Sequence, residues 1–378
     1  DAKYIFLSSC FILHILKGYT PLMETAVQGW PEPVVRVQSL ANSGITRIPE
    51  RYVKPPSHRP ASPRKSVDIP IIDLQHAYSS SKKLRETTLS AISTACREVG
   101  FFQVVNHGVN HQLMRRNREV WREFFHLPMA VKQMYANSPA TYEGYGSRLG
   151  VEIGANLDWS DYFFLHYLPS SLKNPNKWPT LPQSCRGLVA EYGDELTKLS
   201  MRLMKLLSLN LGMKEDDLLV AFGGSEGAGA CLRANFYPKC PQPDLALGLS
   251  AHSDPGGMTI LLADQDVAGL EVHLGDEWVT VKPTPNSFVV NIGDQIQILS
   301  NGLYKSVEHR VLVNSEKERI SLAFFFNPAG ELVISPSELL VSDDRPALYS
   351  PMTFNEYRQY IRKKGICVGK ISLSERQT

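Results

Sequence analysis

Apolar and polar positions change their spacing along the chain, from a helical period in the first half to a strand period in the second. Residues 82–98 and 188–211 carry apolar side chains at the spacing of one helix face, and Gly100 and Gly212 follow them as stop signals. From Ala230 onward, short runs are separated by Pro and Gly, as in a jelly roll. The pattern predicts a mainly β protein with flanking helices. Its core is a double-stranded β-helix, or jelly roll, preceded by a mixed region of helices and strands.

Shifts in composition add boundaries to this picture. The stretch 40–64 is rich in Pro, Ser and Arg and is expected to be an extended arm rather than a packed element. Before Met23 lies an apolar stretch too short to cross a bilayer, and Met23 is the more natural start, so we expect an upstream segment foreign to the native protein. The predicted parts are 1–22 (upstream segment), 23–65 (arm), 66–215 (mixed N-terminal region), 228–330 (jelly-roll core) and 331–378 (C-terminal helical segment).

Two histidines and an aspartate have the spacing of metal ligands. His252 and Asp254 are two residues apart, so on a strand both side chains leave the same face, and His309 comes from a different strand. A lone His-x-Asp pair is more often a structural hydrogen bond, but the distant His makes a metal site the better interpretation. Two His and one carboxylate suit a non-haem Fe(II) oxygenase, although zinc accepts the same ligands.

A second polar pattern follows the metal ligands. Arg319 and Ser321 share one face of a predicted strand, where a guanidinium and a hydroxyl can hold a carboxylate, so a small dicarboxylate is the ligand implied. This pair favours iron over zinc. Arg233, Asn235 and Tyr237 alternate in the same way and place three polar groups on one face.

Composition excludes some classes of function. Lys and Arg number 40 against 38 Asp and Glu, for a net charge of +2, so nothing favours a nucleic-acid partner. No stretch predicts a membrane span. The six cysteines form no Cys-x-x-Cys pair, which suits reduced thiols in the cytoplasm, with the nucleus as a second compartment. The oligomeric state stays open.

Several motifs resemble those of the plant 2-oxoglutarate/Fe(II)-dependent dioxygenases. The runs that carry the resemblance are 70–74, 96–108, 235–243, 252–254, 291–295 and 300–310. The resemblance implies that His252, Asp254 and His309 bind Fe(II). It also implies that the distal carboxylate of 2-oxoglutarate binds Arg319 and Ser321, with Tyr237 and Asn235 assisting. Dioxygen would be the oxidant and ascorbate the reductant that keeps the iron active. Phe236, where many relatives carry Tyr, is expected to face away from the site.

A more specific resemblance is to the jasmonate-induced oxygenases. It rests on the runs 30–40, 158–164 and 357–362 and on Arg233, two residues before Asn235. Arg358 and Arg362 are four apart on a predicted C-terminal helix, so they share a face and, with Arg233, could hold the carboxylate of an apolar acid. Without the resemblance, the same residues read as a solvated basic face. Apolar walls of the pocket are expected from Phe164, Phe325 and Phe354, and the C-terminal segment is expected to close the pocket.

The function implied is the 2-oxoglutarate-dependent hydroxylation of jasmonic acid to 12-hydroxyjasmonic acid, which would lower jasmonate signalling and defence. A flavonoid oxygenase of the flavonol or anthocyanidin synthase type is an alternative, because such enzymes share the iron and cosubstrate residues. A jelly roll that binds a small acid without oxidising it is a second alternative. The sequence favours the first.

Overall fold

The computed structural model describes residues 29–60, 65–147 and 152–364. The predicted upstream segment 1–22 therefore lies outside the described residues, as do Cys10 and Cys367. Within the described ranges, no helix is both long and apolar enough to cross a membrane.

The helices confirm the predicted helical stretches. Helix α3 ends at Glu98, and Gly100 turns the chain into the next strand with φ +70°. A Cβ at Gly100 would lie 2.4 Å from the carbonyl oxygen of Lys305, so only glycine fits there. The α-helices of the described residues are α2 (Val37–Asn42), α3 (Lys82–Glu98), α4 (His111–His126), α5 (Met129–Gln133), α6 (Cys185–Asn210), α7 (Asp217–Ala221), α8 (Gly224–Gly227), α9 (Asp294–Leu299) and α10 (Phe354–Lys364). Short 3-10 helices occupy Glu50–Tyr52, Pro56–His58, Leu74–Tyr78, Ser170–Leu172, Pro175–Lys177 and Glu338–Leu340.

The strands form two principal sheets. One has eight strands in the order β2-β3-β11-β8-β13-β6-β5-β4, and the other has five in the order β1-β10-β9-β12-β7. Strands β14 and β15 form a small hairpin-like pair beside α10. The strands are β1 (Lys65–Val67), β2 (Ile71–Asp73), β3 (Phe101–Val105), β4 (Gly144–Gly146), β5 (Asp161–Leu168), β6 (Gly229–Tyr237), β7 (Leu249–His252), β8 (Met258–Leu262), β9 (Leu270–Leu274), β10 (Glu277–Val281), β11 (Phe288–Ile292), β12 (His309–Val311), β13 (Arg319–Asn327), β14 (Val333–Ile334) and β15 (Met352–Thr353).

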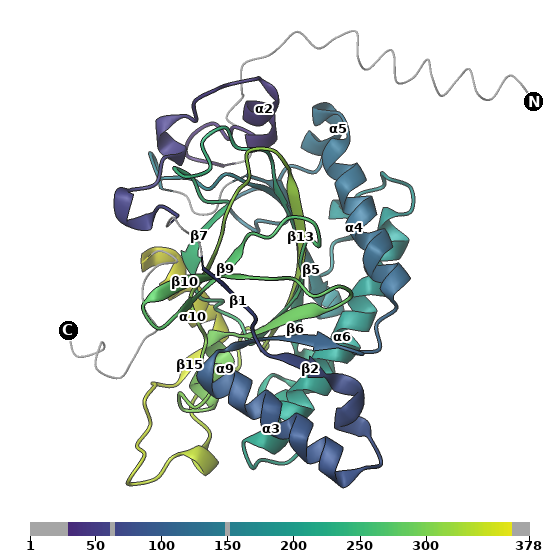
Figure 1. Cartoon of the computed structure of the whole chain (residues 1–378), viewed down its shortest axis with the longest axis vertical. Coiled ribbons are helices and arrows are strands. Elements are labelled where there is room, and N and C mark those ends of the chain that lie inside the picture. Colours follow the sequence, from purple (N-terminus) through teal and green to yellow (C-terminus); the bar gives the residue numbers. More distant parts are fainter. Residues whose placement is uncertain (1–28, 61–64, 148–151, 365–378) are drawn as a thin grey trace, which may run out of the picture.

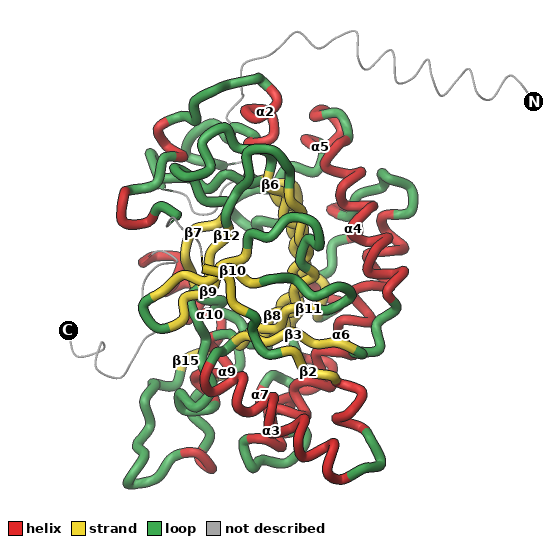
Figure 2. The backbone as a smooth tube through the Cα atoms, in the orientation of Figure 1, coloured by secondary structure: helices red, strands yellow, loops and turns green. Residues whose placement is uncertain are grey.

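The two sheets face each other, and helices cover the outer face of the larger one. Figure 1 shows α4 and α6 along that outer face, with the smaller sheet on the opposite side. The tube in Figure 2 shows the strands gathered at the centre and the helices at the periphery. This arrangement is the jelly roll with flanking helices that the sequence predicts.

Strand β13 illustrates how alternation sorts the two faces. Ile320, Leu322, Phe324 and Phe326 are buried in the apolar core that the sheet shares with the helices. Arg319, Ser321, Ala323 and Phe325 therefore point to the inner face, toward the second sheet. Arg319 and Ser321, the candidate site residues of this strand, lie on that inner face.

The predicted extended arm is wrong for the described part of 23–65. Residues 37–42 form helix α2, and Val37, Ile48 and Tyr52 are buried in a core cluster with Trp159. The backbone N–H groups of Val37 and Gln38 donate to the Asp161 carboxylate at 2.9 and 3.0 Å, so β5 caps this helix. The described part of the arm is packed on the fold because these apolar side chains are buried.

Candidate metal centre and active site

Three candidate ligands meet at the end of the smaller sheet. His252 ends β7 and His309 begins β12, and the two residues are directly paired across these strands. The Nε2 atoms of His252 and His309 lie 3.6 and 3.8 Å from Oδ1 of Asp254, and the two imidazole centroids are 4.2 Å apart. Ligand atoms that share one ion at about 2.1 Å lie about 3 to 4 Å from one another. The spacing therefore fits a single metal ion.

Asp254 reaches this point from a loop and not, as the sequence predicted, from the strand that carries His252. Strand β7 ends at His252, and the loop after it is held by a hydrogen bond from the N–H of Asp294 to the carbonyl of Asp254 at 2.9 Å. Thr259 and Asn291 donate to Oδ2 of Asp254 at 2.6 and 2.7 Å. These bonds leave Oδ1 turned toward the imidazoles, as a metal ligand requires.

The backbone fixes which nitrogen of each imidazole is available. Nδ1 of His252 lies 2.8 Å from the carbonyl oxygen of Ser250, and Nδ1 of His309 lies 3.3 Å from that of Val307. A carbonyl only accepts, so each Nδ1 carries the proton and each Nε2 presents a lone pair to the shared point.

The protonation states of His252 and Asp254 are also those of metal ligands. Burial, with the neighbouring His309, lowers the pKa of His252 to about 4, so its imidazole is neutral at neutral pH. Burial acts to raise the pKa of Asp254, but His309, His252 and the hydrogen bonds from Thr259 and Asn291 outweigh it and hold the pKa below its usual value. Two imidazoles and one carboxylate on one side of an ion fit Fe(II) and leave positions open on the other side.

Beside this cluster, Arg319 is a buried cation. Its side chain is 3% exposed, its Nε donates to the carbonyl of Val267 at 3.2 Å, and its Nη1 donates to Oγ of Ser321 at 3.4 Å. Asn235 and Tyr237 lie opposite Ser321 and Arg319 on β6, and the guanidinium is 5.1 Å from the centre of the Tyr237 ring. In the described part of the chain, no carboxylate forms an ion pair with Arg319. A buried cation without an anion fits a site for a ligand carboxylate.

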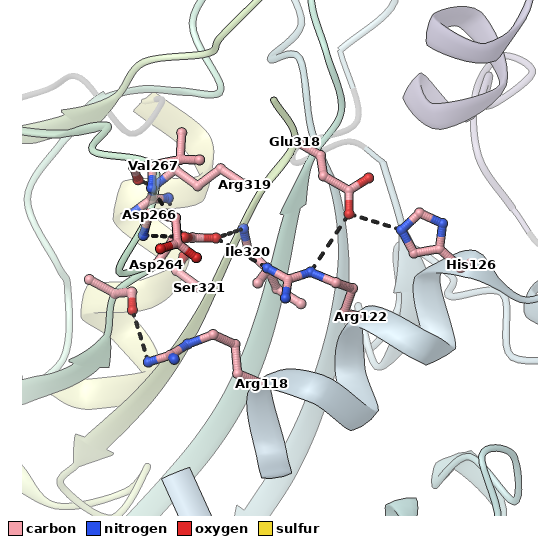
Figure 3. A network of polar contacts seen from close by, with 11 residues as sticks. Arg118, Arg122, His126, Asp264, Asp266, Val267, Glu318, Arg319, Ile320 and Ser321 are labelled. Atoms are coloured by element: carbon pink, nitrogen blue, oxygen red, sulfur yellow. Dashed lines mark hydrogen bonds and ion pairs between the residues drawn. The ribbon is translucent and has the colours of Figure 1, made fainter. Parts of the chain in front are cut away.

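A network behind Arg319 fixes its position (Figure 3). The buried carboxylate of Asp264 accepts from the N–H groups of Asp266 and Val267 with Oδ1 and from the N–H of Ile320 with Oδ2. It therefore ties the loop that supplies the Val267 carbonyl to the strand that carries Arg319.

Helix α4 supports this loop from the outer side of the sheet. Arg122 lies 3.5 Å from Oδ2 of Asp264 and also reaches Glu318, and Arg118 donates to the carbonyl of Ala263 at 3.3 Å. On the inner side, a Cβ on Gly269 would lie 3.0 Å from Cδ of Arg319, so the absence of a side chain at Gly269 leaves room for the guanidinium.

Three of the predicted substrate residues, Arg233, Phe164 and Phe325, lie on the same inner face. Phe164 pairs with Arg233 across β5 and β6, and Phe325 pairs with Cys231 across β13 and β6. Phe164 and Phe325 are half-buried, whereas Phe163 is fully buried in the outer core, so Phe164 is the member of that pair that faces inward. The outer core also contains Phe236, which therefore faces away from the site, as predicted.

Arg233 lies on this inner face, directly opposite Phe164. Its guanidinium lies 4.2 Å from the centre of the Tyr162 ring, and its charge helps to lower the pKa of His252. Its Nε is buried and has no hydrogen-bond partner among the described residues. An unsatisfied donor this close to the metal ligands points toward a bound polar group.

Helix α10 brings a second arginine to this face. Arg358 lies 5.6 Å from the centre of the buried Phe354 ring, and its charge acts on the thiol of Cys231 in β6. Arg362 is four residues further along α10, but its side chain lies outside the described residues.

Sequence reasoning missed the residues that hold the ligands in place. Thr259, Asn291 and Asp264 act through hydrogen bonds between strands that are distant in sequence. Of these three, Asn291 alone carried a signal in the sequence, because it opens the run 291–295 and is the one polar residue of β11.

Comparisons with known proteins agree with this geometry. Residues 228–328 match the 2OG-Fe(II) oxygenase superfamily, and residues 69–181 match the N-terminal family of the non-haem dioxygenase in morphine synthesis. The chain is 61% identical to jasmonate-induced oxygenase 2 of Arabidopsis thaliana over 339 residues, which are 89% of this chain and 91% of that protein. It is 39% identical to a leucoanthocyanidin dioxygenase of Malus domestica, over 86% of this chain and 94% of that protein.

A solved structure extends the comparison to three dimensions. The crystal structure of JOX2 in complex with 2OG, Fe and JA superposes with a TM-score of 0.83 at 61% identity, and the match covers 89% of this chain and 95% of that one.

Proposed function

The chain belongs to the 2-oxoglutarate/Fe(II)-dependent dioxygenases, within the group of jasmonate-induced oxygenases, and from this membership we propose that it hydroxylates jasmonic acid to 12-hydroxyjasmonic acid. As a member of this family it is a dioxygenase that uses Fe(II), 2-oxoglutarate and dioxygen, with ascorbate as the added reductant. Removal of jasmonic acid would lower jasmonate signalling and the defence responses that depend on it.

One observation carries the choice of substrate. The inner face beside the metal ligands is lined by aromatic rings, yet it holds the charge of Arg233, whose buried Nε lacks a partner among the described residues. Arg358 approaches the same strand from α10. An apolar acid satisfies both features, because its carboxylate would pair with the arginines while its ring and chain lie against Phe164, Phe325 and Phe354.

The remaining residues have roles that follow from their positions. His252, Asp254 and His309 would hold Fe(II), and Arg319 with Ser321 would bind the distal carboxylate of 2-oxoglutarate, assisted by Tyr237 and Asn235. When bound, the iron and 2-oxoglutarate would supply the oxidising power: one atom of dioxygen would enter a C–H bond of the substrate, and the other would enter the succinate that forms, with carbon dioxide, from 2-oxoglutarate. The protein fixes the substrate carboxylate and surrounds its apolar part, so that one carbon faces the metal and water is kept away.

Partners and compartment belong to this proposal as well. The partner is a small acid, and the near-balanced charge supports no nucleic-acid partner. Cys96, Cys185, Cys231 and Cys240 are all free thiols, which supports the cytoplasm as the compartment, with the nucleus as a second one.

The test is mass spectrometry of jasmonic acid after incubation with the protein, Fe(II), ascorbate and 2-oxoglutarate. We expect a product heavier by one oxygen atom, formed together with succinate and absent when His252 is changed to Ala. Succinate without any oxidised jasmonic acid would retain the dioxygenase and overturn the substrate.

Arginine variants sharpen the substrate assignment. Arg358→Ala should raise the KM for jasmonic acid by about tenfold or more, because a charged hydrogen-bond partner of the carboxylate is lost. Arg345→Ala is the matched control. Arg345 is exposed, and its backbone hydrogen bonds are with Ser342, which is also exposed. A flavonoid oxygenase would instead oxidise a flavonoid, and its turnover would be insensitive to Arg358→Ala.

A further inference from the structure

A buried carboxylate joins the metal loop to the C-terminal helix. Asp294 is the first residue of α9, and its side chain is 1% exposed. It is not itself one of the predicted iron, cosubstrate or substrate ligands. Its hydrogen bonds instead lead to the segments that carry those sites.

On one side, Asp294 holds the segments that present the metal ligands. Ser253, between His252 and Asp254, donates to Oδ2 of Asp294 at 3.3 Å, and the N–H of Asp294 donates to the carbonyl of Asp254 at 2.9 Å. Ser306, three residues before His309, donates to Oδ1 at 2.7 Å. All three ligands are thus within three residues of a group bonded to Asp294.

On the other side, the same carboxylate anchors α10. The hydroxyl of Tyr357 donates to Oδ2 of Asp294 at 2.8 Å, so Tyr357 and Ser253 share one acceptor oxygen. Burial, followed by the charge of Asp294, raises the pKa of Tyr357, so the phenol stays protonated and remains a donor.

The position of Tyr357 in α10 links this hydrogen bond to the predicted substrate residues. Tyr357 directly precedes Arg358 and follows Phe354 by three residues, so a rotation of α10 that moves Arg358 also moves the Tyr357 hydroxyl. Because Oδ2 also holds Ser253, such a movement acts on the loop that presents His252 and Asp254.

We propose that Asp294 is a positioning residue that couples binding of the substrate carboxylate at α10 to the arrangement of the metal ligands. This inference rests on the proposed function, since it needs an acid that binds Arg358. The acid would set the angle of α10, and the Tyr357 to Asp294 to Ser253 path would transmit that angle to the metal loop. Substrate binding and metal binding would then strengthen each other reciprocally.

The test measures this reciprocity in the full chain. The Kd of Mn(II), which replaces Fe(II) and keeps the site redox-inert, is determined by anaerobic calorimetry with 2-oxoglutarate, in the absence and presence of jasmonic acid. In the wild type, jasmonic acid should tighten Mn(II) binding by about fivefold or more. In Tyr357→Phe, which loses only a hydroxyl, the two Kd values should become equal.

Tyr167→Phe is the matched control. Tyr167 is also buried and its hydroxyl also donates to a carboxylate, but that carboxylate is Asp194 on α6, under the outer face of the larger sheet. We expect Tyr167→Phe to keep the wild-type coupling even if it loses as much thermal stability as Tyr357→Phe. Asp294→Asn is a second variant that should lose the coupling. An amide has one acceptor oxygen, so it cannot accept from Ser306 and from the Tyr357 and Ser253 pair together.

Turnover gives a second readout. In Tyr357→Phe, the amount of hydroxylated product per succinate should fall by about threefold or more, because 2-oxoglutarate would be consumed without correct alignment of the substrate. Wild-type coupling retained in both Tyr357→Phe and Asp294→Asn would overturn the inference and leave the proposed function standing. A wild type that neither binds nor oxidises jasmonic acid would overturn both.

Discussion

At the scale of single residues, Arg319 shows how much a charged side chain depends on neighbours that never touch the ligand. Its Nε is fixed by the Val267 carbonyl, and the Asp264 carboxylate holds the loop that supplies this carbonyl. The cation is fully buried and has no anion of its own in the described structure, so its orientation decides how well it receives a carboxylate.

Asp264→Asn should therefore weaken the binding of 2-oxoglutarate, although residue 264 is not one of the predicted cosubstrate ligands. An amide nitrogen in place of one oxygen cannot accept from the backbone N–H groups, so the loop loosens and we expect the KM for 2-oxoglutarate to rise about tenfold, with kcat changed much less. Steady-state kinetics at varied 2-oxoglutarate measures this. Asp266→Asn is the control, because Asp266 is exposed and contributes only its backbone N–H. A fall in kcat at unchanged KM would contradict the argument.

His107 makes a prediction about pH. Its ring is fully buried, with Nδ1 accepting from the N–H of Val109 and Nε2 donating to the carbonyl of Asn286, and burial lowers its pKa to about 4. The unfolded chain binds this proton more readily than the native protein between about pH 6.5 and pH 4, so stability falls as the pH is lowered through this window.

The size of that effect can be measured by difference. Going from about pH 7 to pH 5, His107 should contribute a loss of about 2 kcal/mol in the free energy of unfolding. Urea unfolding at the two pH values, compared between the wild type and His107→Asn, isolates this residue from other titrating groups. Equal pH dependence in both proteins would show that His107 is not the source.

The predictable part of the site was the part set by alternation within one strand. Arg319 with Ser321, and Arg233 with Asn235 and Tyr237, share faces as their spacing requires. The position of Asp254 was harder, because its loop is held by the N–H of Asp294, which is distant in sequence. Asp264 was out of reach, since its role depends on which loop packs against which strand.

At the scale of elements, helix α6 shows the cost of close packing between a helix and a sheet. Gly193 lies where α6 crosses β5, and a Cβ there would lie 2.3 Å from the ring of Tyr167. The Tyr167 hydroxyl donates to the carbonyl of Ala190 and to the Asp194 carboxylate on the same helix, so the ring is held in place.

Gly193→Ala should therefore lower the free energy of unfolding by about 1 to 3 kcal/mol, in spite of the better helix propensity of alanine. Gly187→Ala, in the same helix and with open space around its Cβ position, should raise it by about 0.5 kcal/mol. Chemical denaturation of both variants gives the comparison. A Gly193→Ala protein that is more stable than the wild type would mean that the Tyr167 ring moves aside at little cost in free energy.

Helices and strands were predicted correctly where a long apolar periodicity supported them. The prediction for the arm was wrong because it rested on composition alone. Helices α3 and α6 follow from many apolar residues at one spacing. The arm was predicted to be extended because Pro, Ser and Arg describe backbone preference, and they say nothing about the burial of Val37, Ile48 and Tyr52, which tertiary contacts decide.

At the scale of the whole molecule, the arm is tied to the metal centre through a chain of polar contacts. Lys54 is buried and donates to Asp158, to Asn156 and to the carbonyl of Leu157. Asp158 also accepts from Ser250 at 2.6 Å, and the carbonyl of Ser250 orients His252.

Lys54→Met should lower the free energy of unfolding by about 2 to 3 kcal/mol, because the partly buried Asp158 carboxylate and two further acceptors lose their cation. Lys65→Met is the control: Lys65 pairs with Glu277 where both side chains are exposed, so its loss should change stability by less than about 0.5 kcal/mol. Urea titrations of the two variants are compared with the wild type. If both changes cost equally little, the arm is not a stabilising part of the fold.

The two-sided character of β13 has a consequence for how the chain tolerates variation. Leu322 is buried in the core under the helices, whereas the neighbouring Ser321 faces the inner side and belongs to the proposed 2-oxoglutarate site. In a saturation screen that scores cellular abundance and product formation separately, damaging substitutions along this strand should alternate residue by residue. Substitutions at 320, 322, 324 and 326 should lower the abundance of the protein. Substitutions at 319 and 321 should leave its abundance unchanged but abolish product formation. Inherited loss of activity through this strand would thus have two molecular causes, an unstable protein or a stable but inactive one, and they would alternate from residue to residue.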